Sequence, residues 1–415
     1  MVSAKLPVIS RPGLAKACAV ALAVGAISPL VFVQPADAAF PGTNGDIAFS
    51  STRSDNVAIY QVNPNGPNLG SPAGDQSATS ALTLGGADVE PFYSPDGKTV
   101  YFSSDRDLAN DWAIFSVPQG TPESASEPAR ELSAVAGNEA HNDYAPSVAP
   151  DGDTVVFNRD NTEIDTLWAP TGASSVCPLY TPSEGLAPAM SDGSGDRPVF
   201  DPVDPTKLLF VGGDGHIHLL SGIKFTAGSN PCATGQTGLT DTDLSAEAFP
   251  SGTQYATGDD ASPDWSPNGQ LIVFSSTRGG GNTLFIMNLA SSPPTGSPIW
   301  PSLAAPNTTV STEPVFSPDG TQVAFVQPRK GTQIFDEMLV SQSNGTWTAN
   351  NMATDLSEQM TNGISLDSEP DWQPVPGTPP VLPEAPYTAA LPAAAIVIGG
   401  LLFGWRYRRG HRRPG

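Results

Sequence analysis

Positive charge, histidine and recognisable catalytic motifs are all scarce in this chain. Of its 415 residues, 19 are Lys or Arg, 42 are Asp or Glu, and 4 are His. A surface with so few cations repels nucleic-acid phosphates, so we expect no nucleic-acid partner. The sequence contains neither a G-x-S-x-G nor an H-E-x-x-H motif, and the histidines before the C-terminal tail are His141, His216 and His218. We therefore do not expect an enzyme.

Cysteine is also rare. Cys18 lies in the N-terminal segment, where a lysine shortly before it and an apolar run after it disfavour a lipoprotein signal. Cys177 and Cys232 do not have the spacing of a metal-binding motif. In an oxidising compartment this pair predicts one disulfide, with two free thiols as the alternative.

Glycine, proline and short clusters of Val, Ile and Phe are abundant. The chain has 41 Gly and 43 Pro, and only 15% of its residues are charged. Gly and Pro interrupt helices, whereas β-branched and aromatic residues favour strands. Because 39% of the residues are apolar, the chain can bury a sizeable core. We expect an all-β protein with many turns.

The N-terminus is typical of an export signal. Residues 1–38 begin with three basic residues, continue with an apolar stretch at 17–33 and end in an A-x-A site at 36–38. This order of a basic, an apolar and a small-residue region predicts a cleaved signal peptide. The mature protein would begin near Ala39.

The C-terminus is typical of a membrane anchor. Residues 389–405 are uncharged and apolar, and five arginines follow in the tail 406–415. The stretch is long enough for a transmembrane helix, and the positive-inside rule keeps the basic tail in the cytoplasm; a buried core helix is the alternative. Pro-rich residues 376–388 predict an extended stalk. We expect a single-pass cell-membrane protein of a bacterial envelope, with its N-terminal ectodomain outside.

The ectodomain is strongly acidic once both ends are excluded. Three of the Lys and Arg residues lie in the signal and five in the tail, so 11 remain in residues 39–386 against 41 acidic residues, a net charge of about −30. Such a surface favours cations or basic partners. The alternative is that the charge only keeps the protein soluble outside the cell.

One phrase recurs along the ectodomain. Its pattern is P-x-[FW]-S-P-D-G-x-x-[IV]-[AV]-F-x-S-x-R, followed by a second apolar stretch such as AIFSV. In SPDG, Pro presets φ and Gly can take a positive φ, so each phrase predicts a strand, a tight turn and two further strands. The marker prolines that begin the phrase are Pro91, Pro146, Pro198, Pro263, Pro314 and Pro370.

The last phrase and the start of the mature chain are complementary halves. The phrase at Pro370 has only its first strand, whereas residues 45–62 have only the second and third. Joining 367–375 to 45–62 completes six repeats of about 55 residues each. A ring closed by strands from both ends leaves no open sheet edge. We predict a six-bladed β-propeller over residues 39–375 in which both ends share one blade.

The repeat resembles that of the TolB-type six-bladed β-propeller family and covers nearly the whole ectodomain. The fourth repeat has FDPVDPTK in place of SPDG, and the closing repeat reads QPVPG, so these two turns depart from the pattern. The resemblance implies that polypeptide segments dock in the central channel. Cys177 and Cys232 follow the third strands of neighbouring repeats, where a disulfide would join adjacent blades.

Acidic residues recur on the first strand of each repeat, which lines the channel of a propeller. Residues two apart on a strand face the same way, so we expect these carboxylates to point into one channel mouth. There they would bind Ca²⁺ or a basic peptide segment, with hydrated, ligand-free loop ends as the alternative. The residues are Asp88, Asp143, Asp260 and Asp367, three positions before the marker proline, and Glu90, Glu313 and Glu369, one position before it.

A second candidate site is the stretch GDGHIHLL. Asp214, His216 and His218 alternate there and would share a strand face, a pattern compatible with a metal site. However, His218 aligns with Tyr or Phe of other repeats, which favours a core or surface histidine. The stretches that begin at Asp192 and Asp241 resemble the start of a calcium loop but lack its glycine and final glutamate.

Together these features predict a cell-surface propeller that binds a protein or peptide at an acidic channel mouth. The alternative is a metal-assisted carbohydrate-active enzyme, a lyase or hydrolase that uses the same carboxylates with a bound ion.

Overall fold

Antiparallel strands account for most of the described chain. The computed structural model describes residues 40–376, which belong to the unit Pro35–Gly415, apart from these internal segments: 53–55, 65–80, 107–110, 125–127, 134–140, 172–174, 187–196, 225, 227, 234, 301–310, 329–334, 343–346, 348–352 and 357–366. The predicted signal peptide, transmembrane helix and basic tail, and the stalk after its first residue, lie outside the described residues. No described helix has both the length and the apolar character needed to cross a membrane.

The strands form six sheets, numbered here as blades 1 to 6. Among the described residues, blade 1 has three strands and the others have four. Blade 1 consists of β23 (Asp367–Val375), β1 (Thr43–Ser51) and β2 (Ala58–Val62). Blade 2 consists of β3 (Asp88–Tyr93), β4 (Thr99–Ser104), β5 (Ala113–Pro118) and β6 (Arg130–Glu131). Blade 3 consists of β7 (Asp143–Val148), β8 (Thr154–Arg159), β9 (Glu163–Trp168) and β10 (Cys177–Tyr180).

The second half of the chain forms the other three blades. Blade 4 consists of β11 (Val199–Phe200), β12 (Lys207–Val211), β13 (Ile217–Ser221) and β14 (Thr240–Asp243). Blade 5 consists of β15 (Asp260–Trp265), β16 (Leu271–Ser276), β17 (Thr283–Asn288) and β18 (Thr295–Trp300). Blade 6 consists of β19 (Thr312–Phe316), β20 (Gln322–Pro328), β21 (Phe335–Ser341) and β22 (Ala353–Asp355). The described helices are short: η3 (Pro231–Ala233), α1 (Leu244–Ala248) and η4 (Thr277–Gly279).

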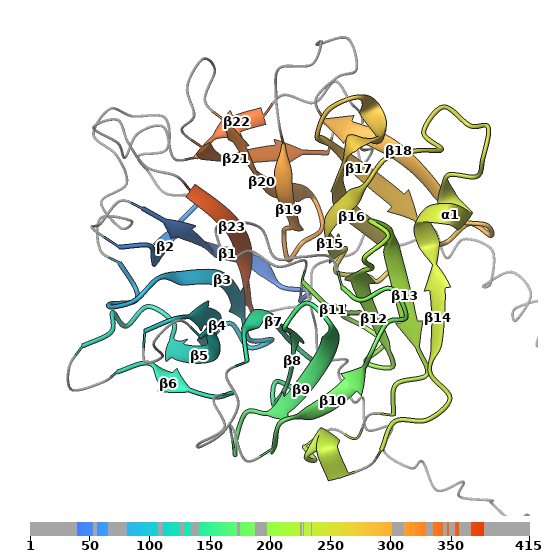
Figure 1. Cartoon of the computed structure of the whole chain (residues 1–415). Coiled ribbons are helices and arrows are strands. Elements are labelled where there is room, and N and C mark those ends of the chain that lie inside the picture. The colour runs from blue at the N-terminus through green and yellow to red at the C-terminus, as the bar shows by residue number, and fades with distance from the viewer. Residues whose placement is uncertain are drawn as a thin grey trace, which may run out of the picture. The chain divides into compact units, whose positions relative to one another are not determined.

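The two ends of the propeller share blade 1, as the sequence predicted. Strand β23 pairs with β1 in antiparallel register, and Ile47 lies opposite Trp372. Figure 1 shows β23, β3, β7, β11, β15 and β19 as the innermost strands around one centre. The predicted all-β six-bladed propeller is therefore confirmed, while the transmembrane helix stays a prediction.

The hydrophobic core consists of one cluster at each junction between neighbouring blades. For example, Trp265 of blade 5 packs with Val199 and Leu209 of blade 4. Blades 6 and 1 are joined in the same way by Val315 and Trp372. The other four clusters join blades 2 and 3, 3 and 4, 1 and 2, and 5 and 6. Because both faces of a blade need a neighbour, apolar burial as well as strand pairing favours a closed ring.

The tight turns follow the sequence prediction. The glycines of the four SPDG-like turns all have positive φ: Gly97, Gly152, Gly269 and Gly320. A Cβ on Gly97 would also lie 2.1 Å from the backbone oxygen of Pro374, so this turn packs directly against the closing strand. In the divergent fourth repeat, the Asp201 carboxylate instead accepts hydrogen bonds from the backbone N–H groups of Val203 and Asp204.

The predicted disulfide is present. Cys177 of β10 bonds to Cys232 of η3, with Cα atoms 5.7 Å apart. The bridge joins the outer strand of blade 3 to the β13–β14 connection of blade 4.

Candidate functional site

The residue before the marker proline has an unusual backbone conformation in five inner strands. Its φ lies between 48° and 56° at Glu90, Ala145, Ser262, Glu313 and Glu369. Strand pairing shifts at the same place: in β3, for example, it passes from Val89↔Ser103 to Phe92↔Tyr101, so two residues oppose one. Each of these strands thus contains a β-bulge, which redirects the side chain at that position.

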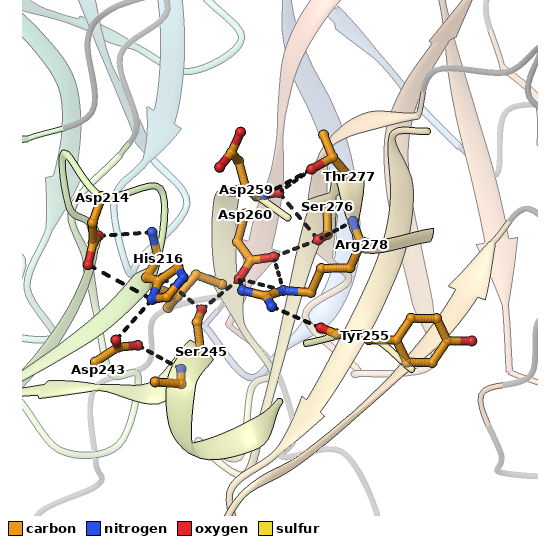
Figure 2. Close-up of polar contacts among 12 residues, drawn as sticks. Asp214, His216, Asp243, Ser245, Tyr255, Asp259, Asp260, Ser276, Thr277 and Arg278 are labelled. Atoms are coloured by element: carbon orange, nitrogen blue, oxygen red, sulfur yellow. Dashed lines mark hydrogen bonds and ion pairs between the residues drawn. The ribbon is translucent and has the colours of Figure 1, made fainter. Parts of the chain in front are cut away.

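The aspartates three positions before the marker proline are buried. Their exposed fractions are 0–2%. In blade 5 the guanidinium of Arg278 contacts both carboxylate oxygens of Asp260, with Nη2 2.7 Å from Oδ2 and Nε 2.8 Å from Oδ1. Figure 2 shows this pair together with Ser276, whose hydroxyl also donates to Asp260.

The same arrangement recurs in other blades. The partners are Arg106 and Ser104 for Asp88, Arg159 for Asp143, and Ser51 for Asp367. The expectation that these four aspartates present their carboxylates at a channel mouth is therefore wrong. The carboxylates of Asp88, Asp260 and Asp367 are enclosed by the serine or arginine of the F-S-S-x-R part of the repeat. In blade 3, which reads F-N-R-D there, Arg159 takes the position of the second serine.

Three of these aspartates also join their blade to the blade before it. Ser245, which follows β14 of blade 4, donates its hydroxyl hydrogen to Asp260 of blade 5 over 2.6 Å and accepts a hydrogen bond from the backbone N–H of Ile217. Thr83 and Ser133 take the same position before Asp88 and Asp143. These carboxylates therefore link neighbouring blades by hydrogen bonds.

The glutamates one position before the marker proline face the opposite way. Ser104 donates to Asp88 over 2.6 Å, whereas the adjacent Ser103 donates to Glu90 over 2.7 Å. Adjacent residues of a strand lie on opposite faces, so Asp88 and Glu90 also lie on opposite faces. The predicted common orientation is wrong because the bulge turns the glutamate away from the aspartate.

The glutamates form a series of hydrogen bonds from each blade to the next, which we call the relay. The Glu313 carboxylate of blade 6 accepts a hydrogen bond from the Glu369 N–H of blade 1, at 2.7 Å. Glu369 accepts one from the Glu90 N–H of blade 2, at 2.6 Å. Glu90 in turn accepts one from the Ala145 N–H of blade 3. Three predicted site residues are thus brought together, each holding the left-handed residue of the next blade.

Arg197 occupies the corresponding position in blade 4 and reaches across the centre of the ring. Its Nη2 donates to the Pro91 carbonyl of blade 2 over 3.1 Å, and its Nη1 lies 3.8 Å from Oδ1 of Asp371 in blade 1. Its guanidinium also lies 5.3 Å from the Phe92 ring centroid. A side chain from blade 4 can contact blades 1 and 2 only through the middle of a six-bladed ring.

Two further carboxylates lie on the inner strands and were not predicted from the sequence. Asp264 accepts a hydrogen bond from the Phe316 N–H, and Asp371 accepts one from the Tyr93 N–H. Burial raises the pKa of Asp264 to about 8, with the charge of Asp371 adding to the effect. Burial raises the pKa of Asp371 to about 7, although the charge of Arg197 opposes the shift. The motif P-D-W, found only in these two repeats, was the available signal.

These side chains define what we call the axial cluster. Its members are Glu90, Glu313, Glu369, Asp264, Asp371 and Arg197. Most are buried, whereas Glu313 and Arg197 are partly exposed. Arg197 is the one basic residue among these six, and its charge acts on Asp371 and Asp264. A cationic group placed beside the cluster would favour the ionised form of the two aspartates.

The second candidate site lies at the start of blade 4's third strand, and the structure brings its predicted residues together. The backbone N–H of His216 donates to Asp214, and the His216 ring lies 2.9 Å from Asp243, as Figure 2 shows. Nε2 of His218 lies 3.3 Å from both carboxylate oxygens of Asp214. Two groups of described residues have possible ligand atoms within 4.8 Å of one another: Glu184, His218 and Asp241, and Asp214, His218 and Asp243. Neither group contains an axial carboxylate.

Sequence comparisons do not assign the chain to a family. No protein-family model and no curated protein sequence matches the chain.

Solved structures match the fold. TolB from Acinetobacter baumannii is similar, with 16% identity and a TM-score of 0.52, over 80% of this chain and 67% of that chain. The protein assigned as TolB in Agrobacterium tumefaciens matches with 16% identity and a TM-score of 0.41, over 80% of this chain and 99% of that chain. Oligogalacturonate lyase from Vibrio parahaemolyticus matches with 11% identity and a TM-score of 0.41, over 76% of each chain. At such identities the similarity establishes the fold alone, a TolB-like six-bladed propeller.

Proposed function

We propose that this propeller is a cell-surface binding module that docks a cationic segment of a protein or peptide at the axial cluster. The observation that carries the proposal is the concentration of acidic side chains on the inner strands of the ring. Burial is the main cause that raises the pKa of Asp264 to about 8 and that of Asp371 to about 7, so ionising these two carboxyl groups is costly. A lysine or arginine of a ligand beside them would favour their ionised form.

The position of the cluster also suits a docking site. Glu313, at the start of the relay, is partly exposed, so its carboxylate can meet a ligand while it holds Glu369. Half-buried Tyr144 of blade 3 lies close enough to Glu90 for that charge to raise the Tyr144 pKa, after burial as the larger cause, to about 12. An aromatic ring beside carboxylates provides both apolar and charged contacts to a basic peptide.

The resemblance of the repeat to TolB-type propellers supports a polypeptide ligand. The predicted signal peptide, stalk, transmembrane helix and cytoplasmic tail would hold the ring at the outer side of a cell membrane. We infer that the chain acts by binding rather than by catalysis.

Site-specific photocrosslinking in intact cells tests this proposal. A photoreactive phenylalanine analogue replaces Tyr144 in the full chain, and a matched control carries it at Val203, which is 43% exposed on the β11–β12 turn. That turn follows the end of inner strand β11, whereas Tyr144 lies near the start of inner strand β7. The two positions therefore lie on opposite faces of the ring. We expect a discrete protein adduct from position 144, competed by an added Lys-rich peptide, and none from position 203. The same adducts from both positions, or none from position 144, would contradict the proposal.

A further inference from the structure

The junction of blades 3 and 4 brings one histidine together with carboxylates from three separate segments. His218 belongs to β13, Asp214 to the β12–β13 turn, Asp241 to β14, and Glu184 to the connection after β10 of blade 3. The His218 side chain is 9% exposed, whereas those of Asp214 and Glu184 are 40% and 28% exposed. A buried imidazole is thus covered by partly exposed carboxylates.

Three of these side chains converge on one point. A Cβ placed on Gly212 would lie 2.8 Å from Oδ1 of Asp214, 2.9 Å from Oε1 of Glu184 and 3.0 Å from Nε2 of His218. Glycine leaves this position free of side-chain atoms. This point is one bond length from the Gly212 Cα, so an ion would sit beyond it, and the ligand atoms of Glu184 and Asp214, which belong to different groups, would close around it. Nitrogen and oxygen ligands take distances of about 2.0–2.2 Å around zinc.

Contacts on the side away from Glu184 and Asp214 fix the orientation of the His218 ring. Its Nδ1 lies 2.8 Å from Oδ1 of Asp241, and Oδ2 of the same carboxylate accepts a hydrogen bond from the hydroxyl of Tyr180 over 2.9 Å. The imidazole also stacks on Phe210, with centroids 5.1 Å apart and planes 23° apart. A carboxylate on Nδ1–H leaves the lone pair of Nε2 directed at the other carboxylates, an arrangement found around metal-ligating histidines.

The backbone is adapted to bring Glu184 close. The N–H of Gly213 donates to the Gly185 carbonyl over 3.1 Å, and a Cβ on Gly213 would lie 2.4 Å from the Glu184 backbone oxygen. The Cys177–Cys232 disulfide joins the same two blades. Blade 3 therefore approaches blade 4 at a distance that a residue with a side chain would prevent.

The cluster has a surplus of negative charge. In the described part of the chain, no Lys or Arg pairs with Glu184, Asp214, Asp241 or Asp243, and their charged contacts are with His216 and His218 alone. Asp243 pairs with His216, while Glu184, Asp214 and Asp241 lie 2.8–3.9 Å from a ring nitrogen of His218. Like charges at such distances repel one another unless a cation offsets them.

We propose that Glu184, Asp214 and His218 bind one divalent cation of the zinc class, with Asp241 as a positioning residue. One imidazole nitrogen with carboxylate oxygens suits Zn²⁺ or Mn²⁺, whereas Ca²⁺ prefers oxygen ligands alone. The cation links blade 3 to blade 4 and keeps a coordination position for water or a ligand group.

Isothermal titration of the metal-stripped full chain with ZnCl₂, purified without a polyhistidine tag, tests this site. We expect one equivalent of Zn²⁺ to bind, with much weaker binding of Ca²⁺. His218→Phe is the key variant, because Tyr60, Phe115 and Phe285 occupy the equivalent position in other blades and the substitution keeps an aromatic ring on Phe210. Loss of this ligand should weaken binding by more than ~100-fold, beyond the ~10–100-fold expected for the positioning variant Asp241→Asn.

Controls separate metal binding from folding. The proposed ligands combine members of both groups around His218. His141 forms a similar pair with Asp160, 2.6 Å apart, but belongs to neither group, so His141→Phe should bind Zn²⁺ like the wild type. Glu184→Gln, at a partly exposed position, should weaken binding even if His218→Phe fails to fold. X-ray absorption of the Zn²⁺ complex should show one imidazole and carboxylate oxygens. No stoichiometric binding to the wild type, or unchanged binding in Glu184→Gln and in folded His218→Phe, would reduce the cluster to a network of ion pairs and overturn the proposal.

Discussion

Replacing Arg278 by methionine should strongly destabilise the propeller. The Arg278 and Asp260 side chains are 1% and 0% exposed, and their contacts include the two hydrogen bonds of a bidentate pair. Arg278 also donates to the Tyr255 carbonyl and lies 4.6 Å from the Phe249 ring centroid. Removing it leaves a buried carboxylate that only hydroxyl groups can satisfy, a change that typically costs about 3–5 kcal/mol.

A surface pair provides the matched control for this experiment. Lys98 and Asp96 are 79% and 53% exposed, so Lys98→Met removes the same charge at an expected cost below about 1 kcal/mol. Urea unfolding followed by tryptophan fluorescence measures both free energies of unfolding. Adding Asp260→Asn to Arg278→Met should recover part of the loss, because the unpaired charge is then gone. Equal costs for Arg278→Met and Lys98→Met would refute the stabilising role of this buried pair.

Three further predictions concern titration, the disulfide and the relay. The pKa of Asp264 is about 8 in the folded chain, against an ordinary value of 3.8, so the folded chain retains a proton that the unfolded chain loses. The free energy of unfolding should therefore fall as the pH rises from about 4 to about 8. Unfolding curves of Asp264→Asn should show a flatter dependence on pH. The disulfide closes a 55-residue separation, so replacing Cys177 and Cys232 by serine should lower the free energy of unfolding by about 4 kcal/mol, with an unchanged value contradicting the crosslink. Glu90→Ala should cost about 1–3 kcal/mol in the same assay, because the buried N–H of Ala145 then keeps only the Ser103 hydroxyl as acceptor and that hydroxyl loses its own acceptor, whereas Glu90→Gln should cost less.

The ring and its closure were predictable because they depend on repeat spacing. The phrase at Pro370 lacked two strands that residues 45–62 supplied, and the pairing of Ile47 with Trp372 follows from joining them. The turn glycines were equally predictable, since SPDG requires a positive φ at its last position. The disulfide followed from the even cysteine count and the adjacent repeats.

The orientation of the acidic residues was not predictable from strand alternation. A positive φ at Glu90 or Glu369 leaves no mark in the sequence, because glycine is the residue expected there. The bulge separated the aspartates from the glutamates and gave them different partners. The arginine and paired serines of F-S-S-x-R were a readable signal, since a buried aspartate needs such partners.

The histidine cluster was predictable in part. The alternation of Asp214, His216 and His218 showed that they could meet, and the structure brings them together. Glu184 could not be found in this way, because it comes from the preceding blade and its approach depends on the packing of two loops. The alignment of His218 with aromatic residues of other blades correctly placed its ring in a largely buried position.

Affinity for a charged peptide tests the central claim most directly. Fluorescence anisotropy would compare a short Lys-rich peptide with a Glu-rich peptide of equal length, using the full wild-type chain, Glu313→Gln at the axial cluster and Glu131→Gln on the exposed outer strand β6. We predict that the wild type and Glu131→Gln bind the basic peptide alone, that salt weakens this binding, and that Glu313→Gln weakens it by about 5-fold, equivalent to about 1 kcal/mol. Equal binding of both peptides, or the same loss from both substitutions, would contradict a cation-binding site at the centre of the ring.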